Sequence, residues 1–416
     1  MLLFSRLIYR VALKGYKLAA FISGFFNQKA KNWAVGQHEC WLKIEEVASQ
    51  FHGAVWVHCA SVGEFEQAKP IIERIKKDFP KKRILVSFFS PSGYPVGKKY
   101  ALADAVVYLP LDSPENARRF VKIIKPCLAV FVKYEFWYFY LQELKSRQIP
   151  TFLVSGIFRS GQVFFRWYGG LFREMLGCFN HILLQDESSA RLMRSIGLTN
   201  VEVAGDTRFD RVLGLANTEF SDQKLETFCS GYKILIAGST WPKDEDLLVP
   251  FFNDAKPVGW KMIIAPHELS ESGFQRIEEI ANKLTERYSQ AIENIESVQI
   301  LIIDNIGLLS KLYRFGNVAF VGGGFGTGIH NVLEPAVYGL PVVFGPRFGK
   351  FKEANDLVEK GGAFSVESYD ELRATLGKLI EDETGRKGCS EVAENYVLQN
   401  SGATETIMVS LRLHFE

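Results

Sequence analysis

Short apolar segments alternate with helical patterns along nearly the whole chain, and this alternation restricts the possible folds more than any other feature. The first series comprises Val55–Cys59, Arg83–Phe89, Ala105–Tyr108, Leu128–Val132, Thr151–Ser155, His181–Leu184 and Val201–Ala204. After a polar stretch near residues 217–224, the second series comprises Lys233–Ala237, Lys261–Ala265, Gln299–Ile303, Val318–Val321 and Pro341–Phe344. Strands separated by helices form parallel sheets that are covered on both faces. The sequence therefore predicts two doubly wound, Rossmann-like α/β domains, with ligands bound in a cleft at the carboxyl ends of the strands.

Length, charge and cysteine content agree with this prediction and exclude some functions. A chain of 416 residues, 47% of them apolar, can bury two ordinary cores. The formal net charge of +2 gives no overall bias toward nucleic acid. The six cysteines form neither a C-x-x-C pair nor a Cys/His cluster. We therefore expect neither a zinc site nor a disulfide framework.

The first 38 residues are basic and amphipathic. They include no acidic residue, and Arg6, Arg10, Lys14 and Lys17 recur at helical spacing among apolar residues. The longest uncharged run, Leu18 to Gln28, is shorter than the roughly 20 apolar residues that span a bilayer. We therefore predict that residues 1–38 lie in the plane of an anionic membrane surface. A helix packed on its own domain is the alternative.

A glycine-rich connection follows the strand Val318–Val321 and indicates a nucleotide site. Glycines at five of the seven positions in Gly322–Gly328 would let the backbone approach a ligand closely. A helix is expected from Asn331 to Tyr338, with its first amide groups near a phosphate and Glu334 near ribose hydroxyls. The pattern is neither the dinucleotide fingerprint nor a P-loop. A tight turn without any ligand is the alternative.

Three charged residues near the ends of predicted strands are candidates for the acceptor side of the site. Glu64 follows the strand Val55–Cys59 and could take a proton from an attacking hydroxyl, but Ser61-x-x-Glu64 is also a capping box. The residues alone leave both roles open. Glu135 follows the strand Leu128–Val132. Arg159 opens a basic and aromatic segment that favours a lipid phosphate over single-stranded nucleic acid, with a core helix as the alternative.

Two further patterns lie in the second half of the chain. Asp244 and Asp246 form a D-x-D pattern that could bind metal, but their place at an expected helix start favours interaction with the helix dipole. His267 and Glu268 follow the strand Lys261–Ala265, where they are either ligand contacts or turn residues. The sequence contains neither H-E-x-x-H nor G-x-S-x-G, so a metal hydrolase or a nucleophile elbow finds no support.

Several motifs together resemble one enzyme family. In order along the chain they are Ser61-Val-Gly-Glu64, Tyr134-Glu135-Phe-Trp137, Gly205-Asp-Thr-Arg208-Phe-Asp210, Gly238-Ser-Thr240, Ala265-Pro-His-Glu268 and the region from Gly322 through His330-Asn-Val-Leu-Glu-Pro335. In these motifs the chain resembles the transferases of 3-deoxy-D-manno-octulosonic acid (Kdo) in lipopolysaccharide assembly. The resemblance implies a GT-B fold and an inverting glycosyltransferase that uses CMP-Kdo and a lipid A precursor of the lipid IVA type. It also implies the cytoplasmic face of the inner membrane, and no metal or other cofactor.

The resemblance assigns roles to particular residues. It implies that Glu64 is the general base that deprotonates the acceptor hydroxyl. The residues implied to bind CMP are Pro266, His267, Ile306, Gly307, Leu308, Asn331, Val332, Leu333 and Glu334. Glu135, Arg159 and Arg208 are candidates for acceptor or cleft contacts. The expected divisions are a membrane-associating segment at 1–38, an acceptor-binding domain at 39–215 and a nucleotide-sugar-binding domain at 225–416.

Two other functions stay open on the sequence alone. One is a GT-B transferase or epimerase that uses a UDP-sugar. The other is a membrane protein that binds a sugar nucleotide without catalysis. For the Kdo transferase, the expected partners are CMP-Kdo, a lipid A precursor and an anionic membrane surface, and nucleic acid is not among them.

Overall fold

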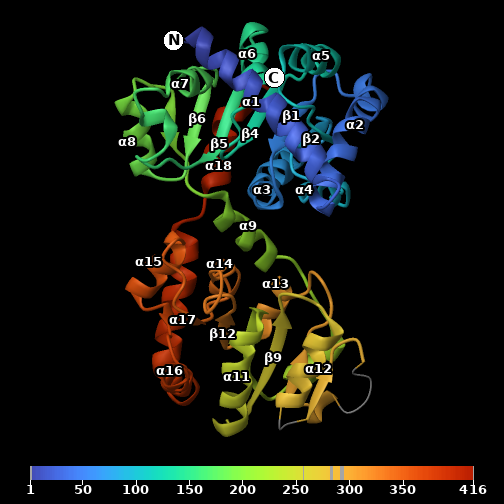
Figure 1. The fold of residues 1–416 in the computed structure, drawn as a ribbon. Coiled ribbons are helices and arrows are strands. Elements are labelled where there is room, and N and C mark those ends of the chain that lie inside the picture. The colour runs from blue at the N-terminus through green and yellow to red at the C-terminus, as the bar shows by residue number, and fades with distance from the viewer. Residues whose placement is uncertain (1, 256, 282–283, 291–294, 416) are drawn as a thin grey trace. The chain divides into compact units, whose positions relative to one another are not determined.

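The computed structural model describes residues 2–255, 257–281, 284–290 and 295–415 (Figure 1). The chain divides into two compact units, the first formed by Met1–Arg211 with Ser401–Glu416 and the second by Val212–Asn400. Each unit contains one seven-stranded sheet in which all neighbouring strands are parallel. The two doubly wound α/β domains predicted from the alternating pattern are thus confirmed.

In the first unit, the sheet has the strand order β3-β2-β1-β4-β5-β6-β7. Its strands are β1 (Val55–Cys59), β2 (Ile84–Phe88), β3 (Ala105–Tyr108), β4 (Leu128–Val132), β5 (Thr151–Gly156), β6 (His181–Leu184) and β7 (Val201–Val203). The helices after the strands are α3 (Val62–Asp78), α4 (Gly93–Lys98), α5 (Pro114–Ile124), α6 (Tyr138–Ser146), α7 (Gly170–Leu176), α8 (Glu187–Ser195) and α9 (Thr207–Ala216). The strand order reverses between β1 and β4, and ligands bind at such a switch point in open α/β sheets.

Two helices precede the first strand. They are α1 (Leu2–Ser23) and α2 (Gln28–Ala48), and the side chain of Asn27 caps α2 by accepting from the Lys29 and Ala30 amides. The helix α2 packs against β3 and α5. The predicted boundary at residue 38 therefore falls inside a helix that belongs to the first unit. The physical reason is that α2 buries Trp33, Cys40 and Ile44.

The helix α1 packs on α2 and α7 but leaves most of its described apolar side chains exposed. These are Phe4, Leu7, Ile8, Val11, Leu18, Phe21 and Ile22, and Phe25 and Phe26 continue the surface in the turn that follows. None of the helices in the described part of the chain combines the length and the hydropathy needed to cross a bilayer.

The last helix, α18 (Ala403–Arg412), belongs to the first unit, so the predicted nucleotide-binding domain 225–416 extends too far. Figure 1 shows this red helix among the blue and green elements of that unit. It packs on α3, and Arg412 Nη2 lies 2.7 Å from Asp78 Oδ2. Asp210 accepts from the amides of Gly402 and Thr404, each at 2.6 Å. Gly402 has a φ of 103°, which favours glycine at the turn that starts the helix.

In the second unit, the sheet has the strand order β10-β11-β9-β8-β12-β13-β14. Its strands are β8 (Lys233–Thr240), β9 (Trp260–Pro266), β10 (Thr285–Arg287), β11 (Ile300–Ile302), β12 (Val318–Val321), β13 (Val342–Phe344) and β14 (Ala363–Ser365). Its helices are α10 (Gln223–Cys229), α11 (Pro242–Ala255), α12 (Glu271–Ile280), α13 (Leu309–Leu312), α14 (Leu333–Ala336), α15 (Lys352–Lys360), α16 (Tyr369–Glu381) and α17 (Glu383–Gln399). Here the switch point lies between β8 and β12.

Candidate active site

Glu64 lies in the first turn of α3, just after the carboxyl end of β1. Its side chain is 8% exposed, and Oε2 accepts from the amides of Ala60 and Ser61, the latter at 3.1 Å. The capping box considered from the sequence is therefore present. Burial, followed by the negative charge of Glu135, raises the pKa of Glu64 to about 7. The capping bonds thus fix a carboxyl group that can exchange a proton near neutral pH.

Glu135 belongs to a buried polar cluster beside the carboxyl ends of β1 and β4. Its Oε2 accepts from Trp137 Nε1 at 2.7 Å and lies 2.8 Å from Nε2 of His58, a fully buried residue of β1. The other ring nitrogen of His58, Nδ1, lies 2.8 Å from Ser87 Oγ in β2. These contacts fix the position of the Glu135 carboxyl group, whose charge acts on Glu64.

The sequence reasoning assigned no role to His58. The only sequence feature that could have indicated a role for His58 was the position of its imidazole in the middle of an apolar strand. Such a side chain requires partners when it is buried. Those partners, Ser87 and Glu135, come from two other strand regions and become neighbours only when β1 pairs with β2 and β4.

The structure places the two candidate arginines differently. Arg159 and Glu64 both act electrostatically on Tyr134, whose pKa is raised mainly by burial, so both charged groups lie near the Tyr134 side chain. Arg208 is on α9, where its Nε donates to Asp206 Oδ2 at 2.8 Å. Arg208 is thus engaged in a local ion pair. Of the aromatic residues that follow Arg159, Phe164 enters the core and Trp167 is 81% exposed.

Close backbone packing explains much of the glycine-rich connection after β12. A Cβ atom on Gly322 would lie 2.2 Å from the carbonyl oxygen of Ser239, and one on Gly324 would lie 2.5 Å from the amide nitrogen of Gly345. Gly323 has a φ of 92°, a left-handed conformation. The density of glycines therefore reflects contacts within the second unit, and it does not by itself demonstrate a ligand.

The prediction of a helix from Asn331 to Tyr338 was wrong, because the helix in the structure is shorter. The helix α14 spans only Leu333–Ala336. Asn331 Oδ1 accepts from the Leu333 amide at 3.0 Å, and Asn331 Nδ2 donates to Glu334 Oε1 at 3.0 Å. Gly339, with a φ of 66°, follows the short helix. So few aligned peptide groups make no substantial dipole, and the predicted phosphate site at a helix N-terminus is not supported.

Three aromatic rings stack beside the switch point of the second unit. Trp241 stacks on His267 with ring centroids 4.8 Å apart, and His267 stacks on His330 at 4.3 Å. Trp241 Nε1 donates to His330 Nε2 at 3.2 Å. Burial, and secondarily the proximity of His267, lowers the pKa of His330, so a neutral acceptor ring is favoured. His267 thus lies at the carboxyl end of β9, directly after Pro266, as the strand pattern predicted.

The acids after Trp241 connect this stack to the glycine-rich connection. Asp244 is 1% exposed, and its Oδ2 accepts from the Trp241 amide at 2.8 Å and from the Gly323 amide at 2.9 Å. Glu245 accepts from Thr240 Oγ1 at 2.8 Å and pairs with Arg276. The expected helix start is confirmed, because α11 begins at Pro242. The two buried acids hold local structure in place.

The remaining predicted donor residues, Ile306, Gly307 and Leu308, form the loop between β11 and α13. Ile306 is 93% exposed, and Gly307 has a φ of 85°. Because β11 pairs with β9 in parallel, this loop and His267 lie at the same edge of the sheet. The sequence reasoning assigned no role to Trp241 or to the ring of His330, which add two aromatic groups to that edge.

Comparison with known proteins shows which family this chain resembles in sequence. The sequence model described as 3-deoxy-D-manno-octulosonic-acid transferase (kdotransferase) matches residues 28–211. The 3-deoxy-D-manno-octulosonic acid transferase of Aquifex aeolicus is 29% identical over 334 residues, which cover 79% of this chain and 86% of that protein. The protein of the same name from Haemophilus influenzae is 26% identical over 388 residues, which cover 87% of each chain.

The fold also has solved relatives. A UDP-GlcNAc 2-epimerase from Neisseria meningitidis, solved with UDP-GlcNAc bound, superposes with a TM-score of 0.61 at 14% identity, over 86% of this chain and 99% of that one. This likeness and the two parallel sheets show the GT-B fold. The match to the family model and to the curated relatives assigns the chain to the glycosyltransferases. Within that class, the chain is similar to the Kdo transferases over most of its length.

Proposed function

We propose that this protein is an inverting glycosyltransferase that moves Kdo from CMP-Kdo to a lipid A precursor of the lipid IVA type in lipopolysaccharide core assembly. Similarity to the Kdo transferases supports the reaction, and one structural observation carries the mechanism. Glu64 is buried at the carboxyl end of β1, is oriented by two backbone amides and has a pKa of about 7. Such a group can act as a base at neutral pH.

In the proposed mechanism, Glu64 accepts the proton of the acceptor hydroxyl while the hydroxyl oxygen attacks the anomeric carbon of Kdo. The bond from that carbon to the CMP phosphate oxygen breaks, and CMP leaves with the electron pair. Attack on the face opposite the leaving group inverts the anomeric centre. Glu135 has a positioning role, because its charge raises the pKa of the base.

The proposed donor site is the carboxyl edge of the second sheet. Pro266, His267, the loop Ile306–Leu308 and the stretch Asn331–Glu334 are the proposed CMP contacts. Trp241 and His330 both stack on His267 and are joined by a hydrogen bond, so they hold the His267 ring in place. We propose that transfer requires neither a metal ion nor another cofactor, and that the phosphate is met by side chains and loop amides instead of a helix dipole.

The pH dependence of transfer tests the assignment of the base. Only the ionised form of Glu64 can accept a proton, so kcat/KM is expected to rise with pH and to level off above about pH 7. Replacing Glu135 with glutamine removes a nearby negative charge and is expected to shift this rise to lower pH. A profile that stays flat between pH 5 and pH 8 in the wild type would rule out this ionisation as the controlling one.

We also propose that the protein acts at the cytoplasmic face of the inner membrane, bound through α1. The exposed apolar residues of α1 accompany Arg6, Arg10, Lys14 and Lys17, a combination that suits an anionic lipid surface. Substituting Leu7 and Val11 with glutamate is expected to weaken binding to anionic vesicles by at least about tenfold in co-sedimentation. These side chains are 57% and 62% exposed, so the fold should tolerate the change.

A matched control separates membrane contact from a general effect of added acid. Val409, on α18, and Leu413, directly after it, are 60% and 77% exposed and lie outside α1. Val409→Glu with Leu413→Glu, which adds the same two acids, is expected to bind vesicles like the wild type. Equal loss of binding in both variants would contradict a specific role for α1.

One experiment tests the reaction itself. Purified protein is incubated with CMP-Kdo and a lipid A precursor, and the mass of the lipid is followed. An increase by whole Kdo units is the expected result, inhibited by CMP and not by UDP. Inhibition by UDP alone would favour a UDP-sugar enzyme, whereas CMP binding without any product would favour a non-catalytic sugar-nucleotide-binding protein.

A further inference from the structure

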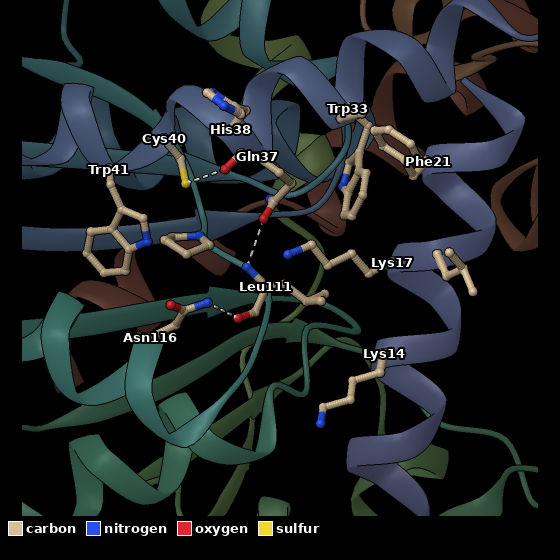
Figure 2. Close-up of a pocket in the computed structure, with 13 residues that line it drawn as sticks. Lys14, Lys17, Phe21, Trp33, Gln37, His38, Cys40, Trp41, Leu111 and Asn116 are labelled. Atoms are coloured by element: carbon tan, nitrogen blue, oxygen red, sulfur yellow. Dashed lines mark hydrogen bonds between the residues drawn. The ribbon is translucent and has the colours of Figure 1, made fainter. Parts of the chain in front are cut away.

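A pocket of about 550 Å³ lies in the first unit between α1, α2 and the residues after β3 (Figure 2). This volume falls within the range of small-molecule sites. The side chains of Leu18, Phe21, Trp33 and Trp41 give it largely apolar walls. The proposed transfer mechanism uses none of these residues, so the pocket is available for another ligand.

Two polar side chains that line the pocket are already engaged within the protein. Gln37 Nε2 donates to the Leu109 carbonyl at 2.8 Å, and Gln37 Oε1 accepts from the Leu111 amide at 2.9 Å. Asn116 Nδ2 donates to the Leu111 carbonyl at 2.8 Å. These bonds attach the segment after β3 to α2. They leave little capacity for hydrogen bonds to a ligand.

Trp33, in contrast, has an unused donor. Its side chain is 4% exposed, and its indole Nε1 is buried without a hydrogen-bond partner among the described residues. Figure 2 shows this nitrogen on the side of the ring that faces the pocket. A buried N–H group without an acceptor is unfavourable. The pocket therefore lacks an acceptor atom at this position.

Two cations at the same pocket also lack partners. Two cations earlier on α1 do have acidic partners: Arg6 Nη2 lies 2.6 Å from Glu174 Oε1, and Arg10 Nη2 lies 3.9 Å from Glu115 Oε1. Lys14 and Lys17 line the pocket, and neither has an acidic partner within the described residues. In Figure 2 the ammonium group of Lys17 points into the pocket. Because the unused groups are two cations and one N–H donor, a ligand with anionic oxygen atoms fits them.

The apolar walls add a second requirement. Leu18 and Phe21 line the pocket and are also 62% and 58% exposed. The wall therefore continues onto the exposed apolar surface of α1. An acyl chain can lie along this continuous apolar surface, whereas a small hydrophilic anion would leave most of the wall unused.

We propose that this pocket binds one anionic phospholipid of the membrane, with an acyl chain along Leu18, Phe21 and Trp41. Lys14, Lys17 and the Trp33 indole N–H hold its phosphate oxygens. The site goes beyond the transfer reaction, since it requires neither Glu64 nor the donor. The exposed approach along α1 favours a bilayer lipid, which is present at high local concentration wherever α1 meets the membrane, over the acceptor.

Native mass spectrometry of the full chain with phosphatidylglycerol tests the proposal. One tightly bound lipid per chain is expected. Replacing Lys14 and Lys17 together with alanine is expected to weaken binding at least about tenfold, because two charge-assisted contacts are lost. The matched control replaces Lys29 and Lys31 with alanine, which removes the same amount of charge from the first 38 residues. These two lysines do not line this pocket. Equal weakening in both double variants would overturn the proposal.

A conservative change tests the indole. Trp33→Phe keeps an aromatic ring and removes the N–H group, so the rise in Tm caused by phosphatidylglycerol is expected to be smaller than in the wild type. An unchanged rise in a folded variant, verified by circular dichroism, would overturn the assigned role of Trp33. One-for-one displacement of bound phosphatidylglycerol by a lipid A precursor would assign the pocket to the acceptor and overturn a bilayer lipid as its occupant.

Discussion

Replacing Glu64 with glutamine is expected to lower kcat for Kdo transfer by about 10²–10⁴-fold, the usual contribution of a general base. Glutamine has nearly the same shape and can still accept from the Ser61 amide, so the first turn of α3 should persist. CMP binding is expected to be unchanged, since the proposed donor contacts lie in the second unit. Product mass measured over time gives kcat, and calorimetry gives the affinity for CMP.

The matched control for this variant is Glu66→Gln on the same helix. Glu66 pairs with Lys69 and Arg211 and has no assigned part in the reaction. Transfer by this control should stay within a few-fold of the wild type. Full turnover in Glu64→Gln would remove Glu64 as the base, and equal losses in both variants would indicate damage to α3 instead of lost chemistry.

Replacing Gly322 with alanine is expected to destabilise the second unit by about 3 kcal/mol or more, which is the upper range for overpacking. The new Cβ atom would lie 2.2 Å from the Ser239 carbonyl oxygen, a backbone atom of β8, and Gly322 directly follows β12, which pairs with β8. Relief therefore requires that β8 and β12 separate near the proposed donor site. Urea unfolding followed by circular dichroism measures the loss.

The same substitution, glycine to alanine, at Gly377 in α16 is expected to stabilise the protein. An added Cβ atom there meets no atom within 4 Å. Because glycine lowers the stability of a helix interior, Gly377→Ala should raise the free energy of unfolding by roughly 0.5–1 kcal/mol. If Gly322→Ala were as stable as Gly377→Ala, the close packing at the glycine-rich connection would not constrain the fold.

The strands were the most predictable part of the structure. Buried parallel strands require continuous apolar and β-branched residues, and most strands of both sheets have that signal. The edge strands Thr285–Arg287 and Ala363–Ser365 were missed because they are short and lack the continuous apolar residues that marked the other strands. The overlong helix after Asn331 was predicted from its position behind a strand, whereas the chain forms only one helical turn before Gly339.

The candidate site was only partly predictable. The positions of Glu64, Glu135 and His267 at strand ends follow from the alternating pattern, because parallel strands align their carboxyl ends. The contact of His58 with Glu135 and the stacking of Trp241, His267 and His330 depend on which strands are neighbours. A single sequence does not specify that order. The resemblance to a family supplied roles for residues that local pattern left open.

The return of α18 to the first unit affects how the protein folds during its synthesis. Ile407, Met408, Leu411 and Phe415 are part of the hydrophobic core of that unit. A ribosome adds them after the whole of the second unit. Domains generally fold in the order in which they emerge. Here the domain that emerges first is completed only after the second one has been made, so its hydrophobic core stays incomplete until α18 has been synthesised.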